Sequence, residues 1–130
     1  MVRVGAGPDQ QNAPGDDTAG AQDYRGVTFV FDLDGTLCDT DGREYSRAHP
    51  KRDRIELVND LYRRGARIIV DTARGSGTNE NWQAKTEAQL KGWGLKFHRV
   101  RTGIKFAGDF YIDDKAQSDR EFFNDRRRID

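Results

Sequence analysis

Phe31-Asp32-Leu33-Asp34-Gly35-Thr36-Leu37, which directly follows the apolar residues 27–30, is the stretch that decides the fold of this chain. The apolar start predicts a strand over 27–32 that is buried on both faces, as in a parallel sheet. Side chains two apart on a strand point to the same side, so Asp32 and Asp34 are expected to address one site. Paired carboxylates at a strand end suit a hard divalent cation and a carboxylate nucleophile.

The composition indicates one small domain with balanced charge. The chain has 130 residues, of which 35% are hydrophobic, and its 22 basic and 22 acidic residues give a formal net charge of zero. A neutral chain lacks the strong attraction to nucleic acids and anionic membranes that a basic chain has, so neither is an expected partner. No apolar run approaches the ~20 residues that span a bilayer. The single cysteine, Cys38, cannot form a disulfide within the chain, which favours the cytoplasm.

Three regions are expected along the chain. Residues 1–23 are rich in Gly, Pro, Asp, Gln and Ala and show no periodicity, which predicts a disordered leader. Residues 24–125 form the predicted folded domain. Residues 126–130 are expected to be a frayed, charged tail.

Strands and helices alternate within the folded domain. Strands are expected at 27–32, 67–71 and 109–113, with a weaker one at 96–100. Helices are expected after Pro50 with a stop at Gly65, over 82–93, and around Phe122 and Phe123, while 38–49 has the polar composition of a loop. This order predicts an α/β fold, a three-layer Rossmann-like parallel sheet with helices on both faces.

Polar residues follow three of the expected strands. They are Asp32, Asp71-Thr72 and Asp113-Asp114. In a parallel sheet, ligands bind outside the carboxyl ends of the strands, so we expect these residues to converge on one site.

The order of these residues resembles the four-motif pattern of the haloacid dehalogenase (HAD) superfamily, over roughly residues 27–118. The four motifs are Asp32-Leu33-Asp34-Gly35-Thr36, Thr72 after an apolar strand, Lys105, and Asp113-Asp114 after another apolar strand. The likeness is strongest to small HAD proteins linked to capsule or sugar-nucleotide biosynthesis. It rests on residues 31–38, Tyr45, Pro50, residues 72–75, Trp82, Gln89-Leu90, Trp93-Gly94 and residues 111–116.

The resemblance implies a Mg²⁺-dependent phosphatase that works through an aspartyl-phosphate. Asp32 would attack phosphorus, and Asp34 would protonate the leaving oxygen and then activate water. Thr72 and Lys105 would bind the phosphoryl oxygens. Arg74 would either grip a second substrate group or pair with Asp71.

The resemblance also implies a metal site and two departures from the usual pattern. Mg²⁺ would be bound by Asp32, the main-chain carbonyl of Asp34, and a carboxylate of Asp113 or Asp114. The segment Gly103-Ile104-Lys105-Phe106 stands where relatives commonly have Gly-Lys-Pro, so one residue is inserted and the proline is lost. Asp71 stands where an apolar or aromatic residue is usual.

No cap domain is expected, because the intervals between Asp34, Thr72 and Lys105 each hold one loop and one helix. An open site of this kind accepts large substrates or is covered by a neighbouring subunit in a homo-oligomer. The family likeness makes a small phosphorylated metabolite of surface-polysaccharide biosynthesis the expected substrate. Two alternatives stay open: a polynucleotide 3′-phosphatase and a non-catalytic HAD-like binding module.

Overall fold

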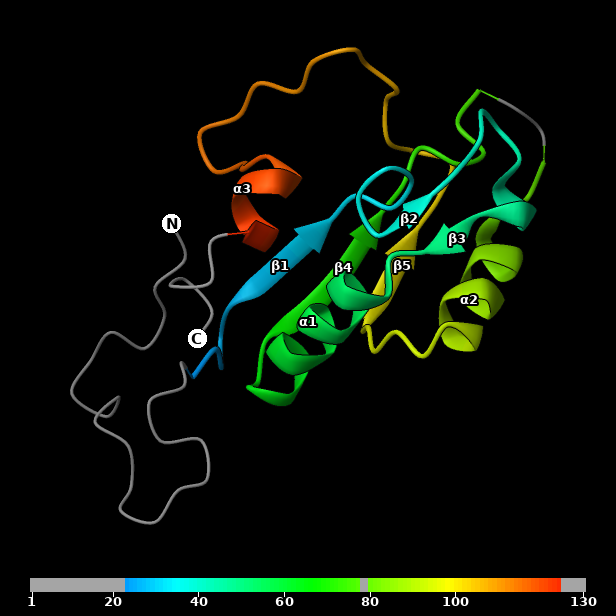
Figure 1. Ribbon diagram of the computed structural model, residues 1–130. Helices are drawn as coiled ribbons and strands as arrows, with labels where there is room; N and C mark the ends of the chain where they lie inside the picture. Colours follow the sequence, from blue (N-terminus) through cyan, green and yellow to red (C-terminus); the bar gives the residue numbers. More distant parts are fainter. Residues whose placement is uncertain (1–22, 78–79, 125–130) are drawn as a thin grey trace, which may run out of the picture.

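The computed structural model describes residues 23–77 and 80–124, and its centre is a parallel β-sheet (Figure 1). The sheet contains β1 (Thr28–Phe31), β4 (Arg67–Asp71) and β5 (Arg99–Arg101) in the order β1-β4-β5. In its register Phe31 lies beside Val70, and Val70 lies beside Val100. The α/β class and the strand expected at 67–71 are therefore confirmed.

Three helices accompany the sheet: α1 (Arg52–Arg63), α2 (Gln83–Gly92) and α3 (Asp119–Asn124). Within the segment expected to be a loop, β2 (Cys38–Asp39) pairs antiparallel with β3 (His49–Pro50), and a 3₁₀ turn, η2 (Tyr45–Arg47), lies between them. Pro50 therefore ends a strand, and Lys51 is the residue that caps α1.

Helix α1 forms where apolar residues recur at helical spacing. Ile55, Val58 and Leu61 are fully buried and make the face that packs on the sheet. The helix ends before Gly65, whose φ of 100° lies in the left-handed region that glycine adopts without strain. A Cβ at Gly65 would lie 2.5 Å from Cγ of Arg25, so close packing also restricts this position to glycine.

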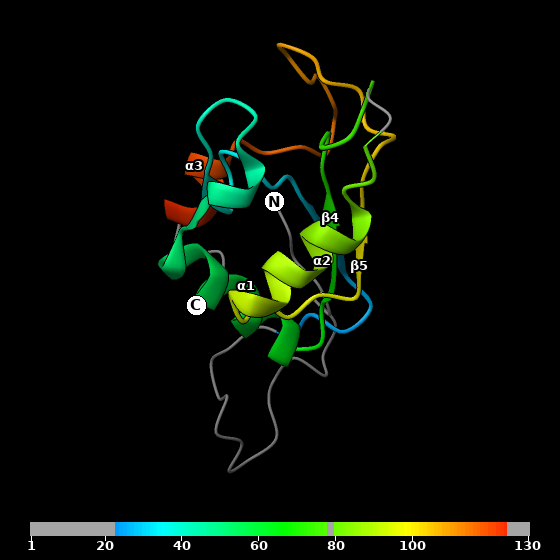
Figure 2. The same cartoon turned by 90° about the vertical axis from the view of Figure 1, so that its right-hand side faces the viewer.

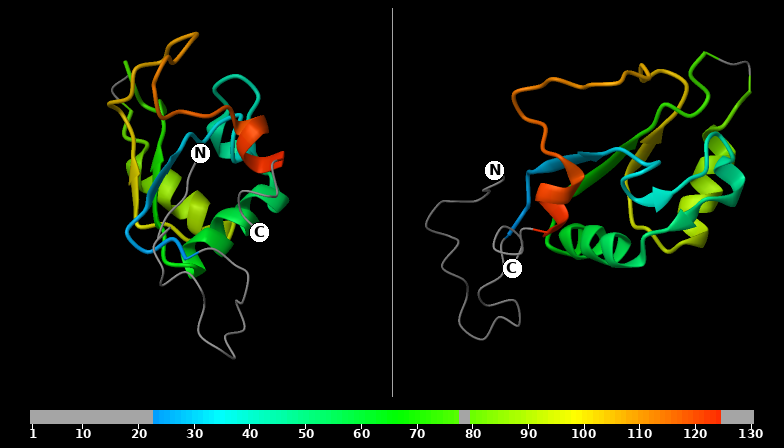
Figure 3. Two further views of the ribbon diagram at one scale, coloured as in Figure 1. Left: turned by 90° about the vertical axis from the view of Figure 1, so that its left-hand side faces the viewer. Right: turned by 45° about the horizontal axis from the view of Figure 1, so that its top comes forward.

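The helices all cover one face of the sheet, and the expected second helical layer is not present among the described residues (Figures 2 and 3). The covered face carries buried apolar side chains: Phe29, Phe31, Ile68, Val70 and Val100. On the opposite face Val30 is 62% exposed, and the two other strands carry Arg67, Asp71, Arg99 and Arg101 there. Because that face is largely charged, burying it under a helix would leave charges without water.

Helix α3 closes the end of the core beside β1. Its Phe122 ring lies 5.8 Å from that of Phe29 and 5.7 Å from that of Phe31, and its Phe123 ring lies 6.0 Å from that of Phe31. Arg54 of α1 lies 4.7 Å above the Phe123 ring and 2.6 Å from Asp119. The expected terminal helix around Phe122 and Phe123 is confirmed.

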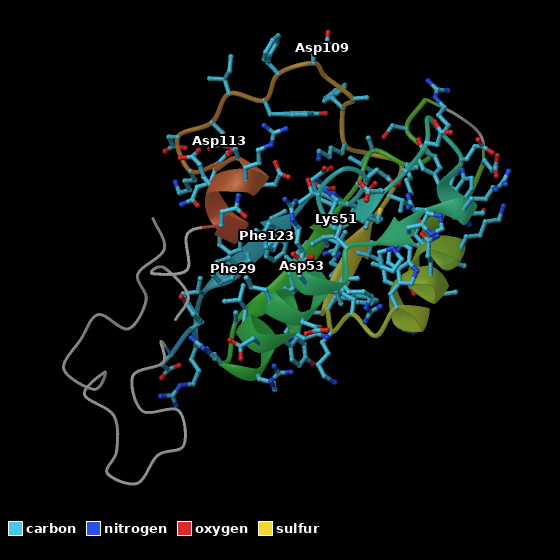
Figure 4. All side chains as sticks on the ribbon, in the orientation of Figure 1. Phe29, Lys51, Asp53, Asp109, Asp113 and Phe123 are labelled. Carbon is cyan, nitrogen blue, oxygen red and sulfur yellow. The ribbon has the colours of Figure 1, made fainter. Side chains whose placement is uncertain are left out.

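The strand expected at 109–113 does not form, and that prediction is wrong for this structure. The segment is an exposed loop that arches from β5 back to α3, and Figure 4 places Asp109 and Asp113 along it. Phe110 and Ile112 are 85% and 96% exposed. The Tyr111 hydroxyl donates to the Phe106 carbonyl at 2.7 Å and accepts from the Gly108 amide at 2.8 Å, so local contacts replace strand pairing.

The remaining expectations concern the chain ends and the inserted segments. The leader, apart from Asp23, and the tail lie outside the described residues. Between Asp34 and Thr72 the chain forms only β2, η2, β3, α1 and β4, without an inserted domain. Among the described helices, none has the length and apolar character needed to cross a membrane.

Candidate functional site

The carboxyl end of β1 turns sharply into the site. Leu33 and Leu37 are fully buried on either side of the turn, and the Leu33 carbonyl accepts the amides of Thr36 and Leu37. Gly35 has a φ of 87°, which permits the reversal. With Leu33 turned inward, the flanking residues Asp32 and Asp34 remain partly exposed at the edge where the strands end.

Asp32 is held by two partners and stays open to solvent. Its Oδ2 accepts the Thr36 hydroxyl at 2.9 Å, and its Oδ1 accepts Nζ of Lys105 at 2.9 Å. The Asp32 side chain is 42% exposed. The Lys105 ammonium can attract an anionic group and so bring it within reach of the fixed Asp32 carboxylate.

Lys105 reaches the site from the loop after β5. Besides Asp32, its Nζ lies 3.4 Å from the main-chain oxygen of Asp71. The loop is fixed on both sides, because the Gly103 amide donates to the Arg74 carbonyl at 2.8 Å and the Ser76 hydroxyl donates to the Lys105 carbonyl at 2.6 Å. The inserted residue in this segment therefore does not keep the lysine from the site.

Asp34 faces a different set of partners from Asp32. Nε and Nη2 of Arg74 donate to its Oδ2 and Oδ1 at 2.9 and 2.8 Å, and the Thr40 hydroxyl donates to Oδ1 at 2.5 Å. Burial raises the pKa of Asp34, but the hydrogen bonds from Arg74 and Thr40 and the charge of Arg74 outweigh it, so the pKa is lowered overall. The ionised carboxylate is the form that can accept a proton.

Arg74 is buried, with 1% of its surface exposed. Its Nη1 donates to Oε1 of Gln89 at 2.7 Å and to the Thr86 hydroxyl at 3.4 Å, and its Cζ lies 4.8 Å from the centre of the Tyr45 ring. The structure thus gives Arg74 protein partners instead of an open surface for a substrate. The expected alternative that Arg74 pairs with Asp71 is wrong, because Asp71 pairs with Arg101 at 2.7 Å.

Thr72 follows β4 as expected and lies at the same edge of the sheet. Its side chain is 1% exposed, and its hydroxyl accepts the Arg74 amide at 3.2 Å. The Thr72 amide continues the sheet by donating to the Arg101 carbonyl at 3.0 Å. Thr72 is therefore close to Arg74 but is covered by protein in this arrangement.

Asp113 and Asp114 are not brought to the site. Asp113 accepts the Lys115 amide at 2.8 Å in an exposed turn, and this bond and one from Asp114 lower its pKa. Among the described residues, no three His, Cys, Asp or Glu side chains are grouped so as to hold a metal ion. The donor set expected for Mg²⁺ is incomplete here, because the strand that was to carry the last carboxylates has not formed.

Several residues of the site were not identified from the sequence. Thr36 and Thr40 each donate a hydroxyl to one of the two aspartates. Thr36 belongs to the first motif of the resemblance, whereas no pattern marks Thr40 for such a role. Tyr45 and Gln89 belong to the segments that carry the HAD resemblance, and that was the signal available for them. They meet at one point, where Nε2 of Gln89 donates to the Tyr45 carbonyl at 2.8 Å.

The chain is similar to a protein of known structure from Vibrio cholerae. The two superpose with a TM-score of 0.66 and 27% sequence identity, over 75% of this chain and 87% of the other. That crystal structure is described as one of an MCSG target, which assigns it no activity. No family model and no curated protein matches the chain. The likeness supports the fold and assigns no function to the chain.

Proposed function

We propose that this protein is a HAD-type phosphatase that transfers the phosphoryl group of a phosphomonoester first to Asp32 and then to water. The observation that carries the proposal is the contact of Lys105 Nζ with Asp32 Oδ1 at 2.9 Å. It puts a nucleophilic carboxylate and a cation for the phosphoryl oxygens side by side at the open edge of a parallel sheet.

The proposed reaction consists of two displacements at phosphorus. In the first, an Asp32 oxygen bonds to phosphorus while the bond to the leaving oxygen breaks. The leaving oxygen keeps the electron pair of the broken bond and receives a proton from Asp34, which enters this step in its protonated form. In the second, a water oxygen bonds to phosphorus, Asp34 takes the proton, and the Asp32 carboxylate is released. Lys105 stays beside the phosphoryl oxygens throughout and offsets their charge.

Mg²⁺ would be held by oxygen ligands of three segments: the Asp32 carboxylate, the main-chain carbonyl of Asp34, and a carboxylate of Asp113 or Asp114. When bound, it would neutralise negative charge on the phosphoryl group. The first two ligands already lie at one turn. The third requires the segment 109–114 to move from its exposed position.

Two features support that movement. The edge of β1 opposite β4 has no strand partner among the described residues, so it can accept residues 109–113 as a fourth strand. Tyr111 already lies near the site, with its ring centre 5.0 Å from Lys105 Nζ. Two extended residues span about 7 Å, so Asp113 is close enough to follow. A three-layer HAD-like arrangement is part of this proposal.

The proposed substrate is a small phosphorylated metabolite, such as a sugar phosphate of surface-polysaccharide biosynthesis, in the cytoplasm. The HAD resemblance supports this choice. The formal net charge of zero favours a small metabolite over a polynucleotide, whose binding depends on basic surface. With no cap domain inserted between Asp34 and Thr72, a neighbouring subunit is the proposed cover for the site.

The test is Mg²⁺-dependent phosphate release from a panel of sugar phosphates, nucleotides and 3′-phosphorylated oligonucleotides. Release that is lost in Asp32→Asn, but kept in Asp39→Asn, would support the proposed nucleophile; Asp39 is a matched carboxylate with an exposed side chain. Preference for oligonucleotides, with activity falling steeply as salt rises, would indicate the 3′-phosphatase instead. Metal binding without release from any substrate would indicate a binding module.

A further inference from the structure

The site holds a buried arginine whose partners are all protein groups, and the proposed reaction leaves it without a role. Arg74 contacts Asp34 with two of its nitrogens and the α2 residues Thr86 and Gln89 with the third. Arg74 is therefore fixed at both ends, with Asp34 on one side and helix α2 on the other.

The second support of Arg74 comes from the η2 turn. The Tyr45 ring lies under the Arg74 guanidinium. The main-chain oxygen of Tyr45 accepts a hydrogen bond from Nε2 of Gln89, the residue that also binds Arg74. The Tyr45 ring in turn contacts the Trp82 ring edge-on at 5.1 Å. Arg74, Gln89 and Tyr45 therefore each contact the other two, so the guanidinium plane cannot rotate without breaking several interactions at once.

The two oxygens of Asp34 differ in how many donors they receive. Oδ1 accepts Nη2 of Arg74 and the Thr40 hydroxyl, and the Cys38 thiol lies 3.6 Å from it. Oδ2 accepts Nε of Arg74 alone among the described residues. A carboxylate oxygen has two lone pairs, so Oδ1 is saturated and Oδ2 keeps one position free.

We propose that Arg74 is a positioning residue, which fixes the Asp34 carboxylate so that Oδ2 is the atom that exchanges the proton with the leaving oxygen and with water. The proposal rests on the proposed phosphatase function. A fork that grips both oxygens sets the plane of the carboxylate, which a single ammonium cannot do. Because Arg74 also contacts Gln89 of α2 and Tyr45 of η2, the positions of α2 and η2 determine where Oδ2 of Asp34 lies.

The experiment compares Arg74→Lys with the wild type on two substrates that differ in their leaving group. An alkyl phosphate needs a proton on its leaving oxygen, whereas para-nitrophenyl phosphate leaves without one. For the alkyl ester we expect kcat/KM to fall by about 10²-fold, the typical effect of a displaced acid–base group. For the aryl ester we expect kcat/KM to hold within about threefold, because its first step needs no proton from Asp34.

The second displacement gives an independent readout. Water activation needs Asp34 with either substrate, so kcat for the aryl ester should also fall by about 10²-fold, with a lowered KM. A burst of one nitrophenol per site should precede the slow phase, because the phosphorylated Asp32 accumulates. Equal losses of kcat/KM for both esters, or a slow reaction without a burst, would overturn the positioning role.

Matched variants separate positioning from folding and from the proposed function. Arg101 makes a similar two-nitrogen contact with the carboxylate of Asp71. Arg101→Lys alters that contact and should leave kcat and kcat/KM for both esters unchanged. Gln89→Met keeps the contact of Arg74 with Asp34 but removes the hydrogen bond that Gln89 accepts from Arg74. It should lower kcat/KM for the alkyl ester and kcat for the aryl ester, each by less than Arg74→Lys does. If Arg74→Lys does not fold, Gln89→Met tests the positioning role in its place. A wild type that releases phosphate from neither ester overturns the phosphatase itself, whereas an active wild type with uniform losses overturns only the role of Arg74.

Discussion

Lys105 lies 73 residues from Asp32 in the sequence, and its Nζ is 2.9 Å from Oδ1 of that aspartate. The contact joins the end of β1 to the loop after β5, on the far side of β4. Gly103, at the start of the Gly103-Ile104-Lys105-Phe106 segment, has a φ of 80°, which lies in the left-handed region. The segment that follows brings the lysine to the edge of the sheet where Asp32 lies.

Replacing Lys105 by methionine should reduce kcat/KM for phosphate release by about 10²- to 10³-fold, because the charge that offsets the phosphoryl oxygens is lost. The measurement is steady-state release from the best substrate of the panel. Lys115→Met is the matched control, since Lys115 is exposed and pairs only with Asp114 among the contacts of the described chain. Activity of Lys105→Met within threefold of the wild type would contradict the proposed role.

Mg²⁺ together with a phosphate analogue should slow amide hydrogen exchange in residues 109–114. The reason is that strand pairing with β1 would give these exposed amides acceptors, and the carboxylates would gain a cation. Hydrogen exchange followed by mass spectrometry measures the effect. Asp113→Asn combined with Asp114→Asn should abolish the protection, whereas Asp109→Asn should keep it. Unchanged exchange in the wild type would exclude the movement that completes the metal site.

The Cys38 thiol should resist alkylation in the folded protein. It is fully buried, and burial together with the nearby Asp34 charge raises its pKa to about 11, despite the opposing hydrogen bond from Thr40. At a pH of about 8 only about a thousandth is thiolate, the reactive form. A chromogenic disulfide reagent should react slowly with the native protein and completely in denaturant. Fast reaction of the native protein would show that the β2 region opens readily.

Asp119→Asn should destabilise the protein at neutral pH by about 1 kcal/mol, the usual worth of a partly buried charged hydrogen bond. The hydrogen bond from Arg54 lowers the pKa of Asp119 below its ordinary value of 3.8. The contribution of a carboxylate with a lowered pKa is present above the ordinary value and is lost as pH falls through the folded-state value. Urea unfolding at about pH 7 and about pH 2.5 measures the difference in unfolding free energy between the wild type and Asp119→Asn. This difference should be smaller at the lower pH.

Glu44→Gln is the control for this pair. Glu44 contacts Arg47 at 3.3 Å with both side chains exposed, so its removal should have little effect at either pH. An Asp119→Asn difference that stays constant between the two pH values would show that the helix α3 contact stabilises through something other than the ionised carboxylate.

The elements that sequence patterns could predict are those with a repeated apolar period. Helix α1 follows from its helical period and strand β4 from its apolar run, and both end within about two positions of the expected residues. The apolar run at 110–112 is as clear, yet it forms no strand, because an apolar run does not say whether the segment will pair with a neighbouring strand. The two-residue strands β2 and β3 are too short to leave a pattern at all.

The site could be predicted to the level of which strand ends carry it. Asp32 and Thr72 lie at the carboxyl edge of the sheet, as the order of strands implied, whereas Asp113 and Asp114, expected there on the same ground, do not. Lys105 was expected at the site only from the resemblance. The partner of Arg74 was not predicted, because the sequence suggested only a substrate group or the nearby Asp71 and gave no sign that Asp34 lies beside the guanidinium. The packing of α2 decides between them: Gln89 and Thr86 hold the guanidinium on the Asp34 side.

The uncovered face of the sheet has a consequence for the thermodynamics of unfolding. Apolar surface that enters water raises the heat capacity, by an amount near 12–15 cal/mol/K per residue for typical domains. With Val30 already exposed and Arg67, Asp71, Arg99 and Arg101 on the same face, unfolding exposes less new apolar surface than it would from a sheet covered on both sides. The heat capacity increment should therefore fall below the typical range, which makes the curve of stability against temperature flatter and its maximum broader.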